Sequence, residues 1–418
     1  MKKELPIIEL IAEEEVAMAK ITFIGDIMVE PPFMQQVENN GRYDFKPSFS
    51  QLKTILKDSD YVIGNLETPL AGQASGYTKE LVSFNSPDVL LDAMVDIGID
   101  AVSTANNHSL DRGYEGLART IETLDRYGIA HTGTYKEGYD GERVLYFTVG
   151  DVICALIACT FSTNYHINKN GLEGSRSNCI NMIHPLTGGG RIYRLMPPEF
   201  GETVSYVESL LGRKLIWEES TKLKRAMGMP RESVDERVPD ELDACFAWVE
   251  EDYRKARERA DLVFFYPHSG GQFNVEPGEY TKYLVAKSAK LGFDAVFAGH
   301  SHTTQLAEYV HGKPCFYSLG NVSMSPGTYY SVAECLPEYG LAAHMYVENK
   351  RIEKVTFSIF KMVQEEGAPM RVVPVDVLLG QLDGESKDAL ETDVAEICSR
   401  VTGREMKSTG IRREYDLI

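Results

Sequence analysis

The chain has 418 residues, a length that allows two or three domains or one large domain with insertions, and with 43% hydrophobic residues it can bury a sizeable core. Its formal net charge of −19 argues against non-specific binding to nucleic acid or to anionic membranes, although a basic pocket for an anionic substrate is still compatible with it. No run of apolar residues approaches the roughly 18 that a membrane-spanning helix needs.

The seven cysteines include no CxxC pair, and Cys154 and Cys159 lie in an apolar run. This usage is typical of buried, reduced thiols in a reducing compartment. Near the N-terminus, acidic residues interrupt the apolar stretch within residues 1–20, so we expect an extra helix or tail there rather than a signal peptide. The simplest expected localisation is cytoplasmic.

Strands and helices alternate from Lys20 to about Ala158, which is typical of an α/β protein. Ser86 and Pro87 suit a helix start, as N-cap and first helical residue, and Gly128 suits a helix end. The expected elements are a strand at 20–25, a helix at 47–57, a strand at 61–64, a helix from 86 to about 97, a strand at 100–104, a helix at 113–127, and a strand pair at 144–149 and 152–159.

Residues 161 to about 240 interrupt this alternation, with three glycines at 188–190, two prolines at 197–198 and little clean periodicity. Loops of this length are usually functional or disordered, so we interpret the segment as a long insertion that forms a lid or a substrate-side element. Arg191 and Arg194 could clamp an anionic substrate, or they could belong to a solvated loop.

After the insertion the alternation resumes and then gives way to consecutive strands. The expected elements are a helix at 241–260, a strand at 262–266, a helix at 278–291, and strands at 294–297, 305–310, 314–318, 341–347 and 352–360. This order predicts two packed sheets with outer helices. We therefore expect an N-terminal extension at 1–19, one domain at 20–365, and a C-terminal extension at 366–418 with a helix near 387–401.

Five of the expected strands end in side chains that can bind a metal. A buried parallel strand that stops at such a residue delivers it to the carboxyl edge of its sheet. The candidate residues at these ends are Asp26, Glu67, Asn107, His108, His268, His300 and His302. Because five strand ends share this form, the sequence predicts one polynuclear metal site.

The residue types suggest different tasks within this site. The two oxygens of Glu67 can touch two cations, and the amide oxygen of Asn107 is a hard, neutral ligand. His108 would point elsewhere and could donate a proton. On an extended segment His300 and His302 would face the same side, so two imidazoles could address two neighbouring ions.

Several of the polar candidates also have simpler interpretations. Asp26 could be a turn residue, and Asp111 could cap the helix that follows it. Asn106 could orient a ligand or only close a turn, and Asn321, beside a glycine, could contact substrate or only form a turn.

The mixture of carboxylate, amide and imidazole donors suits Mn, Fe or Zn better than Ca or Mg. No cysteine lies among the donors, which argues against a structural zinc site. Two ions roughly 3.5–4 Å apart would activate a bound water for attack and brace an anionic transition state. The sequence has no P-loop motif and no GxSxG motif, so nucleotide-cradling and serine-hydrolase chemistry are disfavoured.

These motifs, in this order, resemble the calcineurin-like metallophosphoesterase superfamily and, more narrowly, the bacterial capsule-synthesis CapA family of poly-γ-glutamate production. The resemblance covers roughly residues 20–360. It rests on GDIM at 25–28, NLE at 65–67, ANNHSLDRGYEG at 105–116, HSG at 268–270, GH at 299–300 and YSLGN at 317–321. It implies a four-layer αββα sandwich of the metallophosphoesterase type with a metal centre at the sheet edges.

The resemblance also implies a division of labour. Asn107, His268 and His300 would bind one ion, Asp26 and His302 would bind a second, and Glu67 would bridge the two. His108 would be the general acid. From the residues themselves, and not from the resemblance, we also expect Asp111 to take part in catalysis and Asn106 and Asn321 to contact substrate. The chain departs from the pattern at Met28, where the superfamily has a histidine ligand, and at Gln272, where CapA proteins have a glutamate.

The favoured interpretation is a metal-dependent hydrolase that acts on a phosphoester or another anionic substrate, small or polymeric, through a metal-activated water. One alternative is amide hydrolysis or transfer on a polyglutamate-like polymer at the same centre. Another is a non-catalytic partner protein in which the metal serves structure, an idea that Met28 supports.

Overall fold

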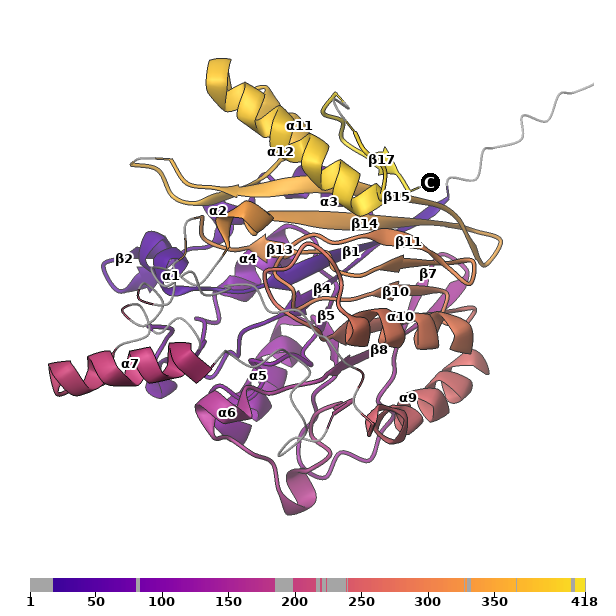
Figure 1. The fold of residues 1–418 in the computed structure, drawn as a ribbon. Helices are drawn as coiled ribbons and strands as arrows, with labels where there is room; N and C mark the ends of the chain where they lie inside the picture. The colour runs from indigo at the N-terminus through magenta and orange to yellow at the C-terminus, as the bar shows by residue number, and fades with distance from the viewer. Residues whose placement is uncertain are drawn as a thin grey trace, which may run out of the picture.

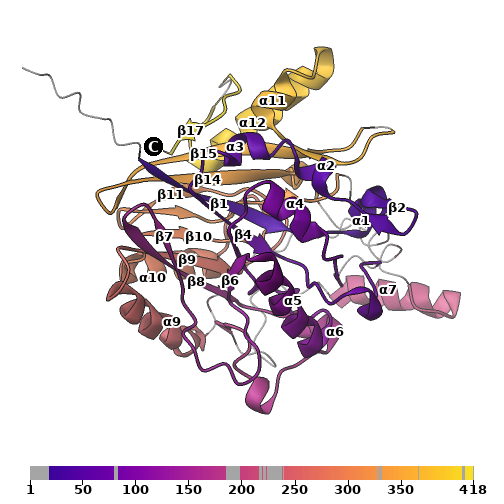
Figure 2. The same cartoon turned by 180° about the vertical axis from the view of Figure 1, so that it is seen from behind.

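The computed structural model describes residues 18–79, 83–184, 198–215, 240–326, 332–365, 367–406 and 410–417, together with the single residues 219, 223, 238 and 328. Within them, two β-sheets lie face to face between outer helices (Figures 1 and 2). The glycines at 188–190, Arg191 and Arg194 lie outside the described residues, as do residues 1–17 of the expected N-terminal extension.

The larger sheet has nine strands, with the order β16-β15-β14-β1-β4-β5-β6, while β13 pairs with β1 and β17 pairs with β15. Its strands are β1 (Ala19–Ile27), β4 (Tyr61–Leu66), β5 (Ala101–Ser103), β6 (Ala130–Thr132), β13 (Asn321–Ser323), β14 (Tyr339–Glu348), β15 (Arg351–Val363), β16 (Arg371–Pro374) and β17 (Tyr415–Asp416). Strands β1, β4, β5 and β6 run parallel, so their carboxyl ends meet at one edge.

The smaller sheet has six strands in the order β11-β12-β10-β9-β8-β7. They are β7 (Leu145–Val149), β8 (Val152–Thr160), β9 (Leu262–His268), β10 (Ala295–Phe297), β11 (Ala307–Val310) and β12 (Lys313–Phe316). Strands β8, β9, β10 and β12 are parallel, and β7 and β8 form the predicted antiparallel pair. A separate two-stranded ribbon joins β2 (Glu38–Asn39) and β3 (Arg42–Tyr43).

Helices cover the outer faces of both sheets. Apolar side chains of α1, α2, α3, α4 and α5 pack against the larger sheet, and those of α9 and α10 pack against the smaller one. The helices are α1 (Pro31–Val37), α2 (Lys46–Phe49), α3 (Lys53–Leu56), α4 (Leu90–Asp96), α5 (Gly113–Tyr127), α6 (Tyr165–Asn168), α7 (Pro198–Leu211), α9 (Leu242–Arg257), α10 (Glu279–Leu291), α11 (Val375–Leu379) and α12 (Gly384–Thr402).

Aromatic side chains fill the space between the sheets. The ring of Phe23 on β1 stacks on that of Phe297 on β10 with centroids 3.7 Å apart. The ring of Phe264 on β9 meets the ring of Phe23 edge-on, with centroids 5.2 Å apart. The hydroxyl of Tyr266 donates a 2.5 Å hydrogen bond to the carbonyl of Ile24, which ties β9 directly to β1. These contacts fix the strand ends of one sheet relative to those of the other, and the predicted four-layer αββα class is confirmed.

Two of the predicted helices differ from the structure because side chains compete with the helical hydrogen bonds. The helix expected at 47–57 is divided into α2 and α3, and in the turn between them the hydroxyl of Ser50 bonds the carbonyl of Pro47. The helix expected from Ser86 begins only at Leu90. The hydroxyl of Ser86 pairs with that of Thr68 and does not cap the helix.

Two observations concern the expected environment of the chain. All seven cysteines lie in the described part of the chain, and none of them forms a disulfide there. None of the helices described is both long enough and apolar enough for a membrane crossing.

His344 on β14 is a buried histidine away from the strand ends, and it makes stability depend on pH. Its Nδ1 lies 2.8 Å from the hydroxyl of Thr22 and its Nε2 lies 2.9 Å from that of Ser358. The Ser358 hydroxyl donates to the carbonyl of Arg413, so it accepts from the Nε2–H of the ring. Burial lowers the pKa of His344 from 6.5 to about 3.

We expect this histidine to cost stability on acidification. Below the pKa of the unfolded chain, the unfolded chain binds a proton that the folded chain excludes. The free energy of unfolding therefore decreases as the pH is lowered, by on the order of 3 kcal/mol between neutral pH and about pH 4. Urea unfolding of the wild type and of His344→Gln at neutral and acidic pH measures this contribution. Equal losses of stability in the two proteins would contradict it.

Candidate metal centre

The carboxyl ends of β1, β4 and β5 in one sheet face those of β9 and β10 in the other. Because both sets of strands are parallel and the sheets are packed together, the residues at these ends converge from five separate parts of the sequence. The converging residues are Asp26, Glu67, Asn107, His108, His268, His300 and His302, none of them more than 5% exposed.

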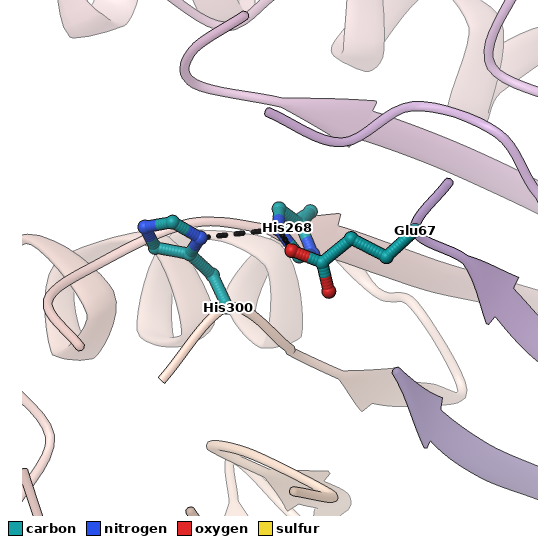
Figure 3. Close-up of side chains that lie close together, drawn as sticks. All are labelled: Glu67, His268 and His300. Atoms are coloured by element: carbon teal, nitrogen blue, oxygen red, sulfur yellow. Dashed lines mark hydrogen bonds and ion pairs between the residues drawn. The ribbon is translucent and has the colours of Figure 1, made fainter. Parts of the chain in front are cut away.

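A first group of donors surrounds the Nε2 atom of His268. This atom lies 2.7 Å from Oδ1 of Asn107, 3.1 Å from Nδ1 of His300 and 3.3 Å from Oε1 of Glu67. Figure 3 shows the Glu67 carboxylate and the two imidazoles turned toward one another. Glu67, His268 and His300 therefore form a buried triad whose donor atoms are close enough to hold one ion.

A second triad shares Glu67 with the first and adds Asp26 and His302. Nδ1 of His302 lies 3.6 Å from Oδ2 of Asp26, and Nε2 of the same ring lies 3.7 Å from Oε1 of Glu67. Glu67 thus stands between the two triads, in the place expected for a bridging carboxylate. Met28, which replaces an expected histidine, is buried, and its carbonyl accepts a hydrogen bond from Ser323.

The burial and the pKa values of Glu67, His268 and His300 are those expected of residues that bind a cation. Both carboxylate oxygens of Glu67 are buried without a hydrogen-bond partner, and burial, then Asp26, raises the pKa of Glu67 well above its ordinary value. Burial also lowers the pKa of His268 to about 4 and that of His300 well below its usual range. Neutral imidazoles beside a carboxylate that lacks partners are the donor set that a divalent ion would satisfy.

His300 and His302 do not alternate along an extended strand, so that part of the sequence prediction is wrong. Strand β10 ends at Phe297, and the two histidines have φ values of 90° and 55°, in the left-handed region. The backbone N–H of His300 donates to Oδ2 of Asp26 at 3.2 Å, which holds the turn against β1. At Gly299 an added Cβ would lie 2.9 Å from Oδ1 of Asp26, so only glycine permits this approach.

His108 lies beside the first triad, and its ring is held from two sides. Its Nδ1 is 2.6 Å from Oδ2 of Asp111, and its ring stacks on that of Phe84 with centroids 4.2 Å apart. Nε2 is left facing the centre, 4.0 Å from Oε1 of Glu67. Burial lowers the pKa of His108, but Asp111, with Glu67 beyond it, outweighs burial, and the net pKa is raised.

Asp111 does not cap α5. The residue at the N-cap is Arg112, which makes no side-chain capping bond, and the Asp111 carboxylate accepts from the N–H of Phe84 at 2.7 Å as well as from His108. Asp111 therefore joins His108 to the segment that carries its stacking partner.

Asn65 belongs to the centre although the sequence reasoning missed it. Its Nδ2 donates to Oδ1 of Asp26 at 2.8 Å and lies 3.2 Å from Nδ1 of His268. The signal was present in the alternation of β4. Asn65 precedes Glu67 by two residues, and in the register of the sheet it stands opposite Asp26.

Asn106 and Asn321 lie behind the ligand candidates, each about 1% exposed. Nδ2 of Asn106 donates to Oδ1 of Asn65 and to the carbonyl of Leu66, while its Oδ1 accepts from the N–H of His108. Asn321 holds His302 at two points, because its Oδ1 is 2.9 Å from Nδ1 of the ring and its Nδ2 donates to the His302 carbonyl. Their contact with substrate stays a prediction.

Comparison with known proteins gives one family and several distant relatives. The profile described as "Bacterial capsule synthesis protein PGA_cap" matches residues 20–325. The uncharacterized protein y4sH of Sinorhizobium fredii (strain NBRC 101917 / NGR234) is 25% identical over 321 residues, which are 71% of this chain and 64% of that protein. The PGA biosynthesis protein CapA of Bacillus subtilis (strain 168) is 20% identical over 342 residues, covering 81% of this chain and 71% of the relative.

Among solved structures, the 5'-nucleotidase of Candida albicans SC5314 aligns with a TM-score of 0.40 and 11% identity, over 92% of this chain and 58% of that one. Of the sequence relatives, the chain spans only about two thirds of the length, as the 64% covered in y4sH indicates.

Proposed function

The chain belongs to the bacterial capsule synthesis protein PGA_cap family, and from that premise we propose that it is a metal-dependent hydrolase of a phosphoester or another anionic substrate. The carboxylate of Glu67 carries the proposal. It is fully buried, neither of its oxygens has a hydrogen-bond partner, and it is shared by two triads of donors. A buried carboxylate without hydrogen bonds is costly in free energy unless a proton or a cation neutralises it.

The donor set indicates which residues would hold the ions. Glu67, Asn107, His268 and His300 would hold one ion, and Asp26, Glu67 and His302 would hold another, with Mn, Fe or Zn favoured by the mixture of oxygen and nitrogen donors. Ions in these places would supply Lewis acidity for an anionic substrate and for water.

His108 is the residue placed to move a proton. Its raised pKa keeps the ring protonated closer to neutral pH, and its Nε2 faces the centre while Nδ1 is occupied by Asp111. We assign to it the protonation of the leaving oxygen, with Asp111 holding the ring in the required orientation. Asn65 and Asn106 act through other residues, because they fix Asp26 and the turn that carries His108.

A second candidate function is suggested by the name of one relative. The Bacillus subtilis protein is a PGA biosynthesis protein, so the same centre in this chain could act on amide bonds of a γ-linked glutamate polymer, by hydrolysis or by transfer. A third possibility, a non-catalytic partner that keeps the ions for structure, makes a different prediction, namely tight metal binding without turnover.

Metal content measured together with turnover tests these candidates. We expect one or two transition-metal ions per chain, turnover of a phosphomonoester or phosphodiester that chelators abolish, and loss of both properties in His268→Ala. The loss of metal affinity should exceed about 100-fold, the scale on which even outer partners of ligands act. His131→Ala makes the same substitution outside the centre and should change neither property.

Each alternative has its own outcome in this experiment. Release of glutamate from a γ-linked polymer, without phosphoester turnover, would favour the second candidate. Stoichiometric metal without turnover of either substrate class would favour the third. A chain that takes up no transition metal, or a His268→Ala variant with unchanged turnover, would contradict the proposed hydrolase.

A further inference from the structure

Helix α12 lies across one end of the two-sheet sandwich, above β14, β15 and β11 (Figure 1). It follows the residues that match the family profile, which end at 325. Its buried face joins the core between the sheets through Leu390, Val394, Ile397, Cys398 and Val401. The helix is therefore a fixed part of the fold and touches both sheets.

Two polar contacts connect α12 to the two sheets. On the side of the larger sheet, Asp393 accepts a 2.6 Å hydrogen bond from the hydroxyl of Tyr339 on β14. On the side of the smaller sheet, Nη1 of Arg400 donates to Oγ1 of Thr303 and to the carbonyl of Cys335, each at 2.9 Å. Thr303 directly follows His302, so Arg400 contacts the turn that carries this ligand candidate.

The side chain of Arg400 is only 7% exposed, and arginine is rarely buried to this extent. A guanidinium group that leaves water needs acceptors for its donors. The acceptors are the hydroxyl of Thr303, the carbonyl of Cys335 and the carboxylate of Glu396, which lies 2.6 Å from Nη2. The hydroxyl of Thr303 in turn donates to the carbonyl of Cys335 at 2.6 Å, so Arg400, Thr303 and Cys335 form a closed triangle of hydrogen bonds.

The turn needs such support because of its backbone conformation. His302 has a φ of 55°, which non-glycine residues adopt only when their surroundings impose it. On the other side of the same turn, the N–H of Phe273 donates to the carbonyl of Ser301 at 2.7 Å, and the ring of Phe273 lies 5.6 Å from that of His302. The thiol of Cys335 donates to the carbonyl of Phe273, and the carbonyl of Cys335 accepts from Arg400, so Cys335 connects the two sides of the turn.

We propose that Arg400 is a positioning residue for His302, so that α12 controls binding of the ion held by Asp26, Glu67 and His302. This inference rests on the metal centre proposed above. The other ion is affected much less. The backbone N–H of His300 donates to Asp26 on β1, and Nε2 of His268 lies 2.7 Å from Oδ1 of Asn107, so both histidines are held by residues other than Arg400 and Thr303. His302 is the only imidazole of its triad, so a small displacement leaves that ion with carboxylates alone.

Mn²⁺ titration of the full-length chain, with free Mn²⁺ followed by EPR, tests the proposal. In Arg400→Met we expect the second ion to bind about 10–100-fold more weakly, the range seen when outer partners of ligands are removed, and the first ion to bind as in the wild type. Arg404→Met removes the same charge from an exposed position just beyond α12 and should match the wild type.

Thr303→Val gives a second, smaller change in case Arg400→Met fails to fold. It removes only the hydroxyl and should weaken the second ion in the same direction. Two ions bound to Arg400→Met and Thr303→Val with wild-type affinities would overturn the proposal, as would equal weakening of both ions. A wild-type chain that binds one ion would overturn it and leave the hydrolase intact, whereas a wild-type chain that binds none would contradict the proposed function itself.

Discussion

Glu67→Gln is expected to stabilise the metal-free protein and to remove the stabilisation that divalent ions confer. The wild-type carboxylate is buried without hydrogen-bond partners, and its pKa is raised well above 4.5 by burial and by Asp26. Above pH 4.5 the unfolded chain releases a proton that the folded, metal-free chain keeps, so wild-type stability falls as pH rises, by about 1.4 kcal/mol per pH unit until the folded pKa is reached. Glutamine carries no such proton and should abolish this slope.

Metal reverses the comparison between the two proteins. At a free Mn²⁺ concentration one hundred times the dissociation constant, ligand linkage adds about 2.7 kcal/mol to the stability of the wild type. Glu67→Gln loses the shared anionic donor of both triads and should gain little. Urea unfolding with EDTA and with Mn²⁺, at about pH 5 and pH 8, measures both effects. A variant that Mn²⁺ stabilises as much as the wild type would refute the bridging role.

Glu414→Gln is the matched control, because it makes the same substitution at a carboxylate that has partners. Glu414 accepts from Lys20 at 2.7 Å, and from the hydroxyls of Tyr346 and Thr356, each at 2.8 Å. Although burial raises its pKa, these donors, with Lys20 foremost, lower it to about 2. Its loss should destabilise the protein at neutral pH with or without metal, the opposite sign to Glu67→Gln in EDTA.

The contrast between these two glutamates indicates what a sequence can and cannot predict. An apolar run that stops at Asp, Glu, Asn or His is a local signal, and it placed Asp26, Glu67 and His268 at the strand ends where the structure has them. Whether a carboxylate then has hydrogen-bond partners depends on distant segments. Lys20 and Glu414 are 394 positions apart, and no local pattern connects them.

The prediction for the turn after β10 was wrong for the same reason. The letters GHSH suit an extended segment, but the left-handed backbone of His300 and His302 is imposed by Asp26, Asn321 and the contact with α12. Arg400 and Thr303 are 97 positions apart, so the arginine carried no signal at all. Asn65 could have been found, because strand alternation places it on the face of Glu67.

His108→Gln is expected to reduce turnover of a poor leaving group by about 10²–10⁴-fold, the range for a lost general acid, with metal content unchanged. Nε2 of His108 is 4.0 Å from Oε1 of Glu67, beside the triads but in neither of them. A leaving group that is already a weak base, such as p-nitrophenolate, needs little protonation, so the same variant should lose much less activity on its ester. An alkyl ester should show the full loss.

The dependence on the leaving group separates proton donation from positioning. If His108 only shaped the centre, both esters would lose activity equally. If it held an ion, metal content would fall as well. Asp111→Asn should give a smaller loss with the same leaving-group pattern, because the ring keeps its stack on Phe84 while it loses the carboxylate that raises its pKa. Steady-state kinetics on paired alkyl and p-nitrophenyl esters, with metal analysis of each variant, decides the matter. Equal losses on the two esters would remove His108 from the role of acid.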